Sequence, residues 1–227
     1  MSTAVIADAH IGGPGGPPAP LIRQLEELAD GPCRRLILLG DLFHVWVGDR
    51  RYETPEIRAV VETLGSLKES GIRLDYVEGN RDFFIGRGPY ADLFDLVGSE
   101  VDFSAAGKRY LAVHGDGLND ADYMYRFWHW LSKSPLSRFM MHNLPGPLAR
   151  AAVHQTEHQL AKTNFKHKRH IPEKVILEYA ERRLGTDYDV LVLGHFHEPK
   201  TWQVSAGEVH LLDAWYRSQR VEWYAES

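Results

Sequence analysis

The sequence predicts an α/β protein, and two features of the chain lead to that prediction. Short apolar segments alternate with segments of helical periodicity over residues 3–77, an order typical of strands joined by helices. Several of the apolar segments are continuous, as expected of strands that are covered on both faces. The chain has 227 residues, of which 44% are hydrophobic and 25% charged, and it can bury a large core. This composition excludes a wholly disordered chain, a collagen and a coiled-coil rod.

The first part of the chain is predicted to fold as strand, helix, strand, helix, strand. The three strands are Thr3–Ala7, Arg35–Leu39 and Ile72–Val77. The helices are Leu21–Ala29 and Pro55–Ser70, and the second has apolar residues at helical spacing and a proline at its start. This order favours an α/β architecture in which helices connect the strands.

A loop is predicted directly after the first strand, at Ile11–Pro20. It contains four glycines and four prolines, a composition that excludes the interior of a helix or a strand. A linker and a functional lid are both open interpretations of it.

The last part of the chain is predicted to add further strands and one helix. The hairpin signal is two apolar segments with a glycine between them, and the helix is bounded by Pro172 and Gly185. In order, we expect a hairpin of Glu100–Phe103 and Arg109–His114, a helix at Glu173–Leu184, a strand at Val190–Leu193, and closing antiparallel strands at Thr201–Val204, Glu208–Leu212 and Arg217–Trp223.

Residues 120–170, called the insertion below, differ from the rest of the chain in charge. They hold eight Lys/Arg and three Asp/Glu, a net of +5 in a chain whose net charge is −5, which leaves −10 for the rest. One helix is predicted from an apolar face of Met124, Phe127, Trp128 and Leu131, a second from Leu136, Phe139 and Met140, and a third from Pro147 toward Asn164. The insertion is interpreted either as a helical subdomain packed on the core or as a basic amphipathic lid that contacts lipid or an acidic substrate.

The overall charge and the cysteine count limit the partners and the compartment. With 31 acidic and 26 basic residues, any anion site must be local, and we expect no nucleic-acid partner. Cys33 is the only cysteine, so no intramolecular disulfide can form and a cysteine-based zinc site is disfavoured. The N-terminus lacks the pattern of a secretory signal, and no stretch approaches the about 18 apolar residues of a membrane helix. These features predict a cytoplasmic protein.

Five short polar motifs each follow directly after an apolar segment. They are Asp8-Ala9-His10, Gly40-Asp41, Gly79-Asn80-Arg81-Asp82, His114-Gly115-Asp116 and Gly194-His195-Phe196-His197. Residues just past the carboxyl ends of strands converge at one edge of an α/β sheet, so these groups can meet at one site.

The motifs offer seven candidate metal ligands. They are Asp8, His10, Asp41, Asn80, His114, His195 and His197. Two carboxylates, four imidazoles and one amide oxygen, without a thiolate, suit Mn²⁺, Fe²⁺, Co²⁺ or Zn²⁺ better than Ca²⁺. Seven ligands exceed one tetrahedral site and suffice for two ions if one carboxylate bridges them.

The order of these motifs resembles that of the calcineurin-like metallophosphoesterases. The resemblance implies a four-layer αββα sandwich, with a catalytic domain of residues 1–119 and 171–227 and the insertion as a helical lid. It implies a dinuclear site, for which we expect Mn²⁺ first and Fe²⁺, Co²⁺ or Zn²⁺ as alternatives. Carried over residue by residue, Asp8, His10, Asp41 and His197 hold one ion, and Asp41, Asn80, His114 and His195 hold the other, with Asp41 bridging.

Within this family a closer resemblance is to the UDP-2,3-diacylglucosamine pyrophosphohydrolases of the lipid A pathway. The matching segments are Ile6–His10, Leu39–Phe43 with Trp46 and Gly48-Asp49, Gly79–Phe83, and His114–Asp116 followed by Asp122 and Tyr125. The 81 residues from His114 to His195 leave room for the helical lid of those enzymes. The resemblance implies hydrolysis of UDP-2,3-diacylglucosamine to UMP and 2,3-diacylglucosamine 1-phosphate, with peripheral contact to the cytoplasmic face of the inner membrane. Phe196 and Glu198 depart from the family pattern and leave the exact substrate open.

Arg81 bears on the kind of bond that is cleaved. In many relatives a histidine stands here to protonate a leaving alkoxide, whereas arginine keeps its proton and cannot act as a general acid. A phosphoanhydride needs no general acid, because its leaving group is a phosphate with a second pKa near 6. Arg81 therefore favours pyrophosphate cleavage over alkyl ester hydrolysis. The alternative interpretation is a surface arginine paired with Asp82.

The expected site combines catalytic and substrate-binding groups. The catalytic candidates are Asn80, Arg81, His114 and His195, and the substrate-binding candidates are Arg81, Asp122, Tyr125, Asn164, Lys166, Lys168 and His195. Arg169 is a further candidate for the phosphates, and Tyr125, Trp128, Leu131, Phe139, Met140 and Leu144 are candidates for an acyl groove. A metal-dependent phosphodiesterase or nuclease of the same fold, and a non-catalytic scaffold, are the alternatives to this function.

Overall fold

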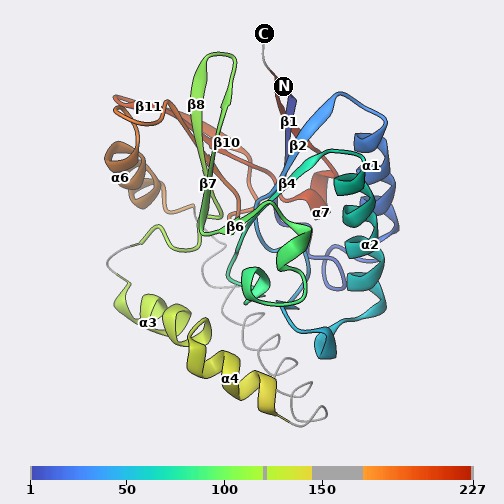
Figure 1. Cartoon of the computed structure of the whole chain (residues 1–227). Coiled ribbons are helices and arrows are strands. Elements are labelled where there is room, and N and C mark those ends of the chain that lie inside the picture. The colour runs from blue at the N-terminus through green and yellow to red at the C-terminus, as the bar shows by residue number, and fades with distance from the viewer. Residues whose placement is uncertain (1, 120–121, 145–170, 226–227) are drawn as a thin grey trace.

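The computed structural model describes residues 2–119, 122–144 and 171–225 (Figure 1). It shows two five-stranded sheets face to face, with helices against their outer faces and the helices α3 and α4 below them. The predicted third helix of the insertion, from Pro147 toward Asn164, lies outside the described residues. The candidates Asn164, Lys166, Lys168 and Arg169 lie outside them as well.

The first sheet has the strand order β12-β1-β2-β4-β6. Its members are β1 (Ser2–Ile6), β2 (Cys33–Leu38), β4 (Arg73–Val77), β6 (Leu96–Gly98) and β12 (Glu222–Tyr224). The first four run parallel, and β12 pairs with β1 in the antiparallel sense. Helices α1 (Ala19–Ala29) and α2 (Pro55–Glu69) cover its outer face, and the Thr54 hydroxyl caps α2 by accepting a hydrogen bond from the backbone N–H of Ile57.

The second sheet has the strand order β10-β11-β9-β8-β7. Its members are β7 (Glu100–Ala105), β8 (Lys108–Val113), β9 (Val190–Leu193), β10 (Lys200–Val204) and β11 (Gly207–Leu211). The hairpin β7–β8 is antiparallel as predicted, and so is the pair β10–β11. Helix α6 (Glu173–Arg183) packs on the outer face of this sheet.

Side chains that alternate along the strands form three apolar layers, which lie between the four layers of helices and sheets. In β1, Ala4 and Ile6 join the core under α1 and α2, whereas Val5 joins the core between the two sheets. In β8, Ala112 joins the same inter-sheet core, and Leu111 joins the core under α6. Because strand side chains point to opposite faces in turn, β1, β8 and β9 contribute apolar side chains to the layers on both of their sides. This arrangement confirms the predicted αββα sandwich.

The segment after β11 corrects one sequence prediction. Arg217–Trp223 is predicted to be one closing antiparallel strand, but it contains the end of a short helix, α7 (Trp215–Ser218), and only then β12. Gln219 ends the helix in the left-handed region, with φ 51°. Strand β12 then pairs with β1 in the first sheet. The short pair β3 (Trp46–Val47) and β5 (Asp82–Phe83), together with β6, was not predicted.

The insertion begins with two helices, α3 (Tyr123–Ser132) and α4 (Pro135–Asn143), which confirms its helical pattern in the described part. Neither helix has a buried residue. Eight large apolar side chains of α3 and α4 are 51–76% exposed: Tyr123, Met124, Phe127, Trp128, Trp130, Leu136, Phe139 and Met140. The apolar face of α3 is therefore not packed on the core of the described sandwich. Among the described residues, no helix combines the length and the hydrophobicity needed to cross a membrane.

Candidate metal centre

The five polar motifs meet at the end of the sandwich where the parallel strands finish. Asp8 follows β1, Asp41 follows β2 and Asn80 follows β4 in the first sheet. His114 and His195 follow β8 and β9 in the second sheet. Because these strands are parallel within each sheet, their carboxyl ends lie at one edge. Both sheets thus contribute side chains to one site.

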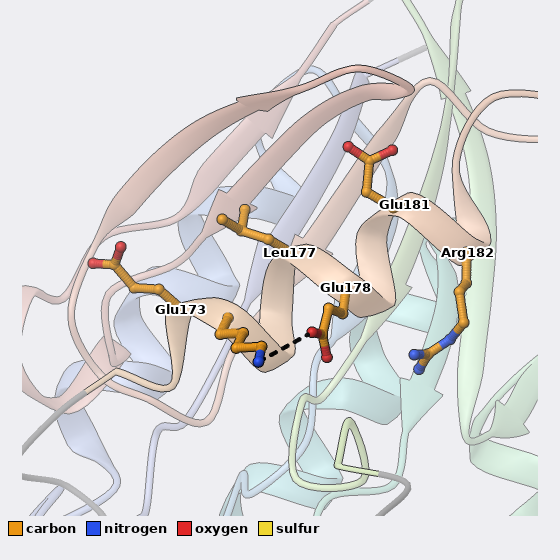
Figure 2. A pocket seen from close by; sticks show the side chains of 6 residues that line it. Glu173, Leu177, Glu178, Glu181 and Arg182 are labelled. Atoms are coloured by element: carbon orange, nitrogen blue, oxygen red, sulfur yellow. Dashed lines mark ion pairs between the residues drawn. The ribbon is translucent and has the colours of Figure 1, made fainter.

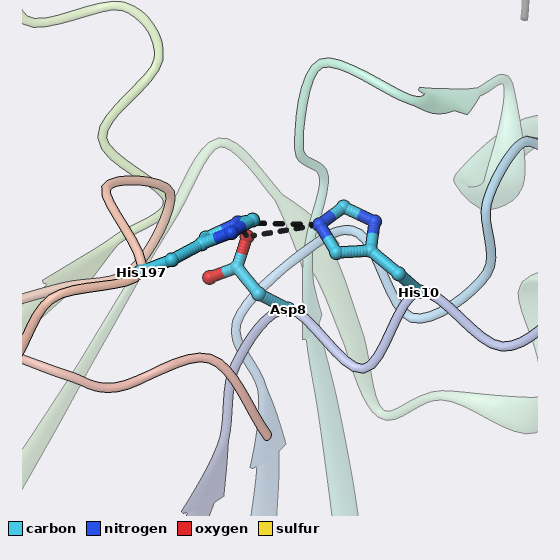
Figure 3. Close-up of side chains that lie close together, drawn as sticks. All are labelled: Asp8, His10 and His197. Atoms are coloured by element: carbon cyan, nitrogen blue, oxygen red, sulfur yellow. Dashed lines mark hydrogen bonds and ion pairs between the residues drawn. The ribbon is translucent and has the colours of Figure 1, made fainter. Parts of the chain in front are cut away.

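One cluster consists of Asp8, His10 and His197 (Figure 3). Nε2 of His197 lies 3.0 Å from Oδ1 of Asp8, and Nε2 of His10 lies 3.7 Å from the same oxygen. The two Nε2 atoms are 3.2 Å apart. All three side chains are buried, and their ligand atoms lie within 4.8 Å of one another. Two imidazoles directed at one carboxylate oxygen can share a single divalent cation.

A second cluster consists of Asp8, Asp41 and His114. Nε2 of His114 lies 3.7 Å from Oδ1 of Asp41, and the other oxygen of Asp41 lies 3.9 Å from Nε2 of His10. Asp41 therefore faces both clusters. Nδ1 of His114 donates a hydrogen bond of 2.9 Å to the carbonyl of Leu39, which fixes the ring and turns Nε2 toward the carboxylates.

His195 and Asn80 complete the set that the sequence predicted. The His195 ring lies 5.1 Å from the His114 ring between centroids, and its backbone N–H donates to Oδ2 of Asp8 at 2.7 Å. Within the described part of the chain, Oδ1 of Asn80 and Nε2 of His114 are buried without a hydrogen-bond partner. Leaving such atoms unpaired is costly, and a divalent cation would satisfy both. The donor set therefore fits a metal centre.

The backbone at the site is held in a strained conformation. Five non-glycine residues of the predicted ligand set have φ between 47° and 68°: Asp8, His10, Asp41, His195 and His197. Left-handed backbone is rare for residues with a Cβ atom and clusters at functional sites. This backbone conformation directs the side chains of successive motif residues toward the same site.

Two glycines leave room for the ligand side chains. A Cβ atom on Gly79 would lie 2.4 Å from Oδ1 of Asp41 and 2.9 Å from Nε2 of His114. A Cβ atom on Gly194 would lie 2.7 Å from Oδ2 of Asp8. The side chains of the predicted ligand set thus occupy the space that a Cβ atom would need at either glycine.

Burial and neighbouring charges shift the pKa values of the cluster in opposite directions. Burial, together with the charge of Asp8, raises the pKa of Asp41 to about 6. Burial opposes ionisation of Asp8 as well, but the imidazoles of His114 and His197 outweigh it and hold the pKa of Asp8 below its ordinary value. Burial lowers the pKa of His195 to about 3. Burial opposes protonation of His114, but the carboxylates of Asp41 and Asp8 outweigh it and raise the pKa of His114 to about 9. Buried carboxylates that hold a proton on a neighbouring imidazole form an environment that a divalent cation would stabilise.

Arg81 is buried, and this corrects the alternative interpretation of it as a surface residue paired with Asp82. Its side chain is 5% exposed. Nη1 donates to the carbonyl of His44 at 3.1 Å, and Nε lies 3.5 Å from Oδ2 of Asp41. Asp82 instead accepts hydrogen bonds from the backbone N–H groups of Gly79 and Asp41, at 2.8 and 2.9 Å. Arg81 thus places a guanidinium beside the predicted metal ligands.

The two described substrate candidates of the insertion lie at the start of α3. Oδ1 of Asp122 caps this helix by accepting a hydrogen bond of 2.9 Å from the backbone N–H of Tyr125. The Tyr125 hydroxyl donates to Oδ2 of Asp116 at 2.6 Å, two residues beyond His114. The structure therefore brings Tyr125 next to the cluster and uses one oxygen of Asp122 as a helix cap.

Sequence analysis missed two residues next to the cluster. The hydroxyl of Tyr216, in α7, lies 3.3 Å from Nδ1 of His197. Nζ of Lys133, at the end of α3, donates to the carbonyl of Gly79 at 2.9 Å. Neither residue belongs to a motif, and no periodic pattern points from either one to the site. Only the packing of distant elements identifies them.

Two hollows on the described surface differ in their relation to the site. The larger lies on the outer side of α6 (Figure 2) and is lined by Glu173, Lys174, Leu177, Glu178, Glu181 and Arg182. Its exposed ion pair of Lys174 and Glu178, 3.9 Å apart, is typical of a solvated helix face, and none of the predicted ligands lines it. The smaller, of about 270 Å³, lies between α4 and the sandwich, and Val47, Phe84 and Met141 contribute to its lining.

Comparison with known proteins agrees with the motif order. The sequence model of the calcineurin-like phosphoesterases matches residues 1–199. A UDP-2,3-diacylglucosamine hydrolase of Stutzerimonas stutzeri is 33% identical over 171 residues, which cover 73% of this chain and 69% of that protein. Another, of Stenotrophomonas maltophilia, is 28% identical over 218 residues, covering 91% and 86%.

A solved structure adds evidence for the fold alone. A hypothetical protein of Pyrococcus horikoshii superimposes with a TM-score of 0.51 at 12% identity, over 99% of this chain and 88% of that one. The family match spans most of the chain, and the relatives share a third of their residues with it or slightly fewer. The chain therefore belongs to the calcineurin-like phosphoesterase family, a family of metal-dependent hydrolases.

Proposed function

We propose that this protein hydrolyses the pyrophosphate of UDP-2,3-diacylglucosamine and releases UMP and 2,3-diacylglucosamine 1-phosphate, a step of lipid A biosynthesis. The observation that carries the proposal is the buried cluster of carboxylates and imidazoles with Arg81 buried beside it. The names of the curated relatives supply the substrate. Family membership by itself supports the coarser function, metal-dependent hydrolysis.

Two divalent cations are proposed as the cofactor, with Mn²⁺ favoured and Fe²⁺, Co²⁺ or Zn²⁺ as alternatives. When bound, such a pair stabilises charge on the oxygens of a phosphoryl group and makes water nucleophilic near neutral pH. In this proposal Asp8, His10, Asp41 and His197 hold one ion, and Asp41, Asn80, His114 and His195 hold the other. Support for Asp41 as the shared ligand comes from its two oxygens, because Oδ2 lies 3.9 Å from Nε2 of His10 and Oδ1 lies 3.7 Å from Nε2 of His114.

Arg81 is proposed to bind the substrate pyrophosphate. Its guanidinium offers several donors in a planar fork that matches phosphate oxygens. It lies at the edge of the cluster, because its backbone N–H donates to Oδ1 of Asp41 at 3.0 Å and its Nε faces Oδ2. A permanently charged group at this position neutralises the departing phosphate but cannot protonate an alkoxide. The side chain therefore favours a phosphoanhydride over an alkyl phosphodiester.

The insertion is proposed to bind the acyl chains and to contact the membrane. The hollow between α4 and the sandwich combines apolar side chains, Val47, Phe84 and Met141, with the basic Arg138 and His142. Such a mixture suits an acyl chain near an anionic head group. The exposed aromatic and aliphatic side chains of α3 and α4, in a segment of net positive charge, are typical of helices that lie at a lipid surface.

The experiment that tests the function is a direct assay of the reaction. Protein loaded with Mn²⁺ is incubated with UDP-2,3-diacylglucosamine in detergent, beside a chelated sample, and UMP is quantified. We expect release of UMP that stops on chelation. If no UMP is released but a generic phosphodiester is hydrolysed, the proposed substrate is refuted and the proposed metal centre still stands.

A matched substrate tests the role of the insertion. UDP-glucosamine without acyl chains presents the same pyrophosphate to the metal centre but leaves the proposed acyl site empty. We expect a much higher KM for it. Equal rates on both substrates would refute acyl binding by the insertion while leaving pyrophosphate hydrolysis in place.

A further inference from the structure

Lys133 connects the insertion to the loop that carries Asn80. It stands at the C-terminal end of α3, and its side chain is 16% exposed. Nζ donates a hydrogen bond of 2.9 Å to the carbonyl of Gly79, the residue directly before Asn80, and lies 3.8 Å from Oε2 of Glu78. A residue of the insertion thus holds the peptide bond that leads into a predicted metal ligand.

The peptide groups of Gly79 are held on both sides. Its N–H donates to Oδ2 of Asp82 at 2.8 Å, and its carbonyl accepts from Lys133 at 2.9 Å. Glu78 fixes the same loop from outside, because its Oε1 accepts the backbone N–H of Ile85 at 2.9 Å while Oε2 faces Lys133. Gly79 has no side chain to pack, and a Cβ atom there would collide with Asp41. The position of Asn80 therefore depends on these backbone hydrogen bonds.

We propose that Lys133 is a positioning residue for the metal centre: by holding the carbonyl of Gly79, it keeps Asn80 in place to bind the second ion. The inference rests on the proposed dinuclear function. It makes the insertion part of the support of the metal centre in addition to its proposed role in substrate binding. Outer groups that orient metal ligands typically contribute 10- to 100-fold in metal affinity.

Two other contacts of the same kind supply matched controls. Nζ of Lys68 donates to the carbonyl of Asp92 at 3.0 Å, a lysine–carbonyl hydrogen bond between α2 and the short 3-10 helix Ala91–Leu93. The Tyr52 hydroxyl donates to the carbonyl of Met141 at 2.9 Å and fastens α4 to the sandwich without touching the loop of Asn80. Lys68→Met therefore reports loss of a similar bond elsewhere, and Tyr52→Phe reports a weaker attachment of the insertion.

The test is a titration of the full-length, metal-free protein with Mn²⁺ by isothermal titration calorimetry. We expect two ions on the wild type. In Lys133→Met we expect one ion to bind about 10- to 100-fold more weakly and the other unchanged. Lys133→Arg, whose guanidinium still donates, should bind both ions with affinities within a few fold of those of the wild type. Lys68→Met and Tyr52→Phe should bind both ions as tightly as the wild type does. In the UMP assay, Lys133→Met should recover kcat at high Mn²⁺, because Lys133 acts through the metal ligand.

Each contrary result has a defined meaning. Two ions bound by Lys133→Met with wild-type affinities would overturn the role of Lys133 and leave the proposed function intact. Equal weakening in Tyr52→Phe would also overturn it, because attachment of the insertion would then explain the effect. A wild type that binds no second ion would overturn the dinuclear centre and this role together. Near-ultraviolet circular dichroism checks folding, and Lys133→Gln replaces Lys133→Met if the latter does not fold.

Discussion

Replacing Gly79 by alanine tests the packing of the metal centre most directly. The added Cβ atom would lie 2.4 Å from Oδ1 of Asp41, whereas ordinary contact begins near 3.4 Å, so one of the two must move by about 1 Å. Asp41 has little room to retreat, because it is 2% exposed and the same oxygen accepts the backbone N–H of Arg81 at 3.0 Å. The Cβ atom would also press on Nε2 of His114, at 2.9 Å.

A misplacement of about 1 Å at a catalytic centre costs on the order of 100-fold in rate, which corresponds to about 2.7 kcal/mol. We therefore expect kcat/KM for release of UMP by Gly79→Ala to fall by about two orders of magnitude at a fixed Mn²⁺ concentration. Gly79 does not have a left-handed φ, so alanine is compatible with its backbone and the effect is steric.

Gly65→Ala is the matched control. Gly65 lies within α2, and a Cβ atom there would have no neighbour within 4 Å. This variant should retain full activity and gain about 0.4–1 kcal/mol of stability, because alanine restricts the unfolded chain and favours the helix. If folded Gly79→Ala kept activity within about threefold of the wild type, the close approach of Gly79 to Asp41 would be refuted.

Three further predictions concern other residues. Asp41→Asn should abolish chelator-sensitive UMP release and weaken binding of both ions in a Mn²⁺ titration, because Asp41 faces both clusters; retention of either property would contradict a bridging role. Tyr216→Phe should weaken Mn²⁺ binding about 10-fold by removing the hydroxyl beside Nδ1 of His197, and unchanged affinity would show that the contact does not orient the ring. Hydrogen bonds from Arg51 lower the pKa of Asp49 from 3.8 to about 2, so its contribution to stability is present above pH 3.8 and lost as the pH falls through 2. Asp49→Asn should therefore lower the melting temperature at neutral pH, and the difference from the wild type should shrink toward pH 2.

The positions of the central strands and the meeting of the motifs follow from local sequence features. Continuous apolar segments mark strands that are buried on both sides, and the structure places β1, β2, β4 and β9 within a residue or two of the predicted bounds. Once those strands are known, the convergence of residues after their carboxyl ends is a consequence of parallel pairing. This is why the candidate ligands could be grouped without any knowledge of long-range contacts.

The features that sequence could not predict all depend on contacts between distant segments. β12 pairs with β1 across the whole length of the chain. The three residues of β12 carry no pattern that predicts which strand they pair with. The burial of Arg81 depends on the carbonyl of His44 and on Asp41, and Lys133 reaches Gly79 from a helix 54 residues away. Periodicity predicts which face of an element is apolar. It does not predict which residues that face, or a single polar side chain, will contact.

The strain and the charge of the site explain why it needs so large a scaffold. Left-handed backbone at five non-glycine residues costs about 1 kcal/mol or more at each, a sum of the same order as the about 5–15 kcal/mol that stabilises a whole protein. Buried carboxylates add a further cost until cations are bound. These residues all follow strands whose side chains are apolar on both faces and packed in three layers. Burial of those layers offsets the strain, so the chain can hold an unfavourable arrangement of ligands that bound metal ions then stabilise.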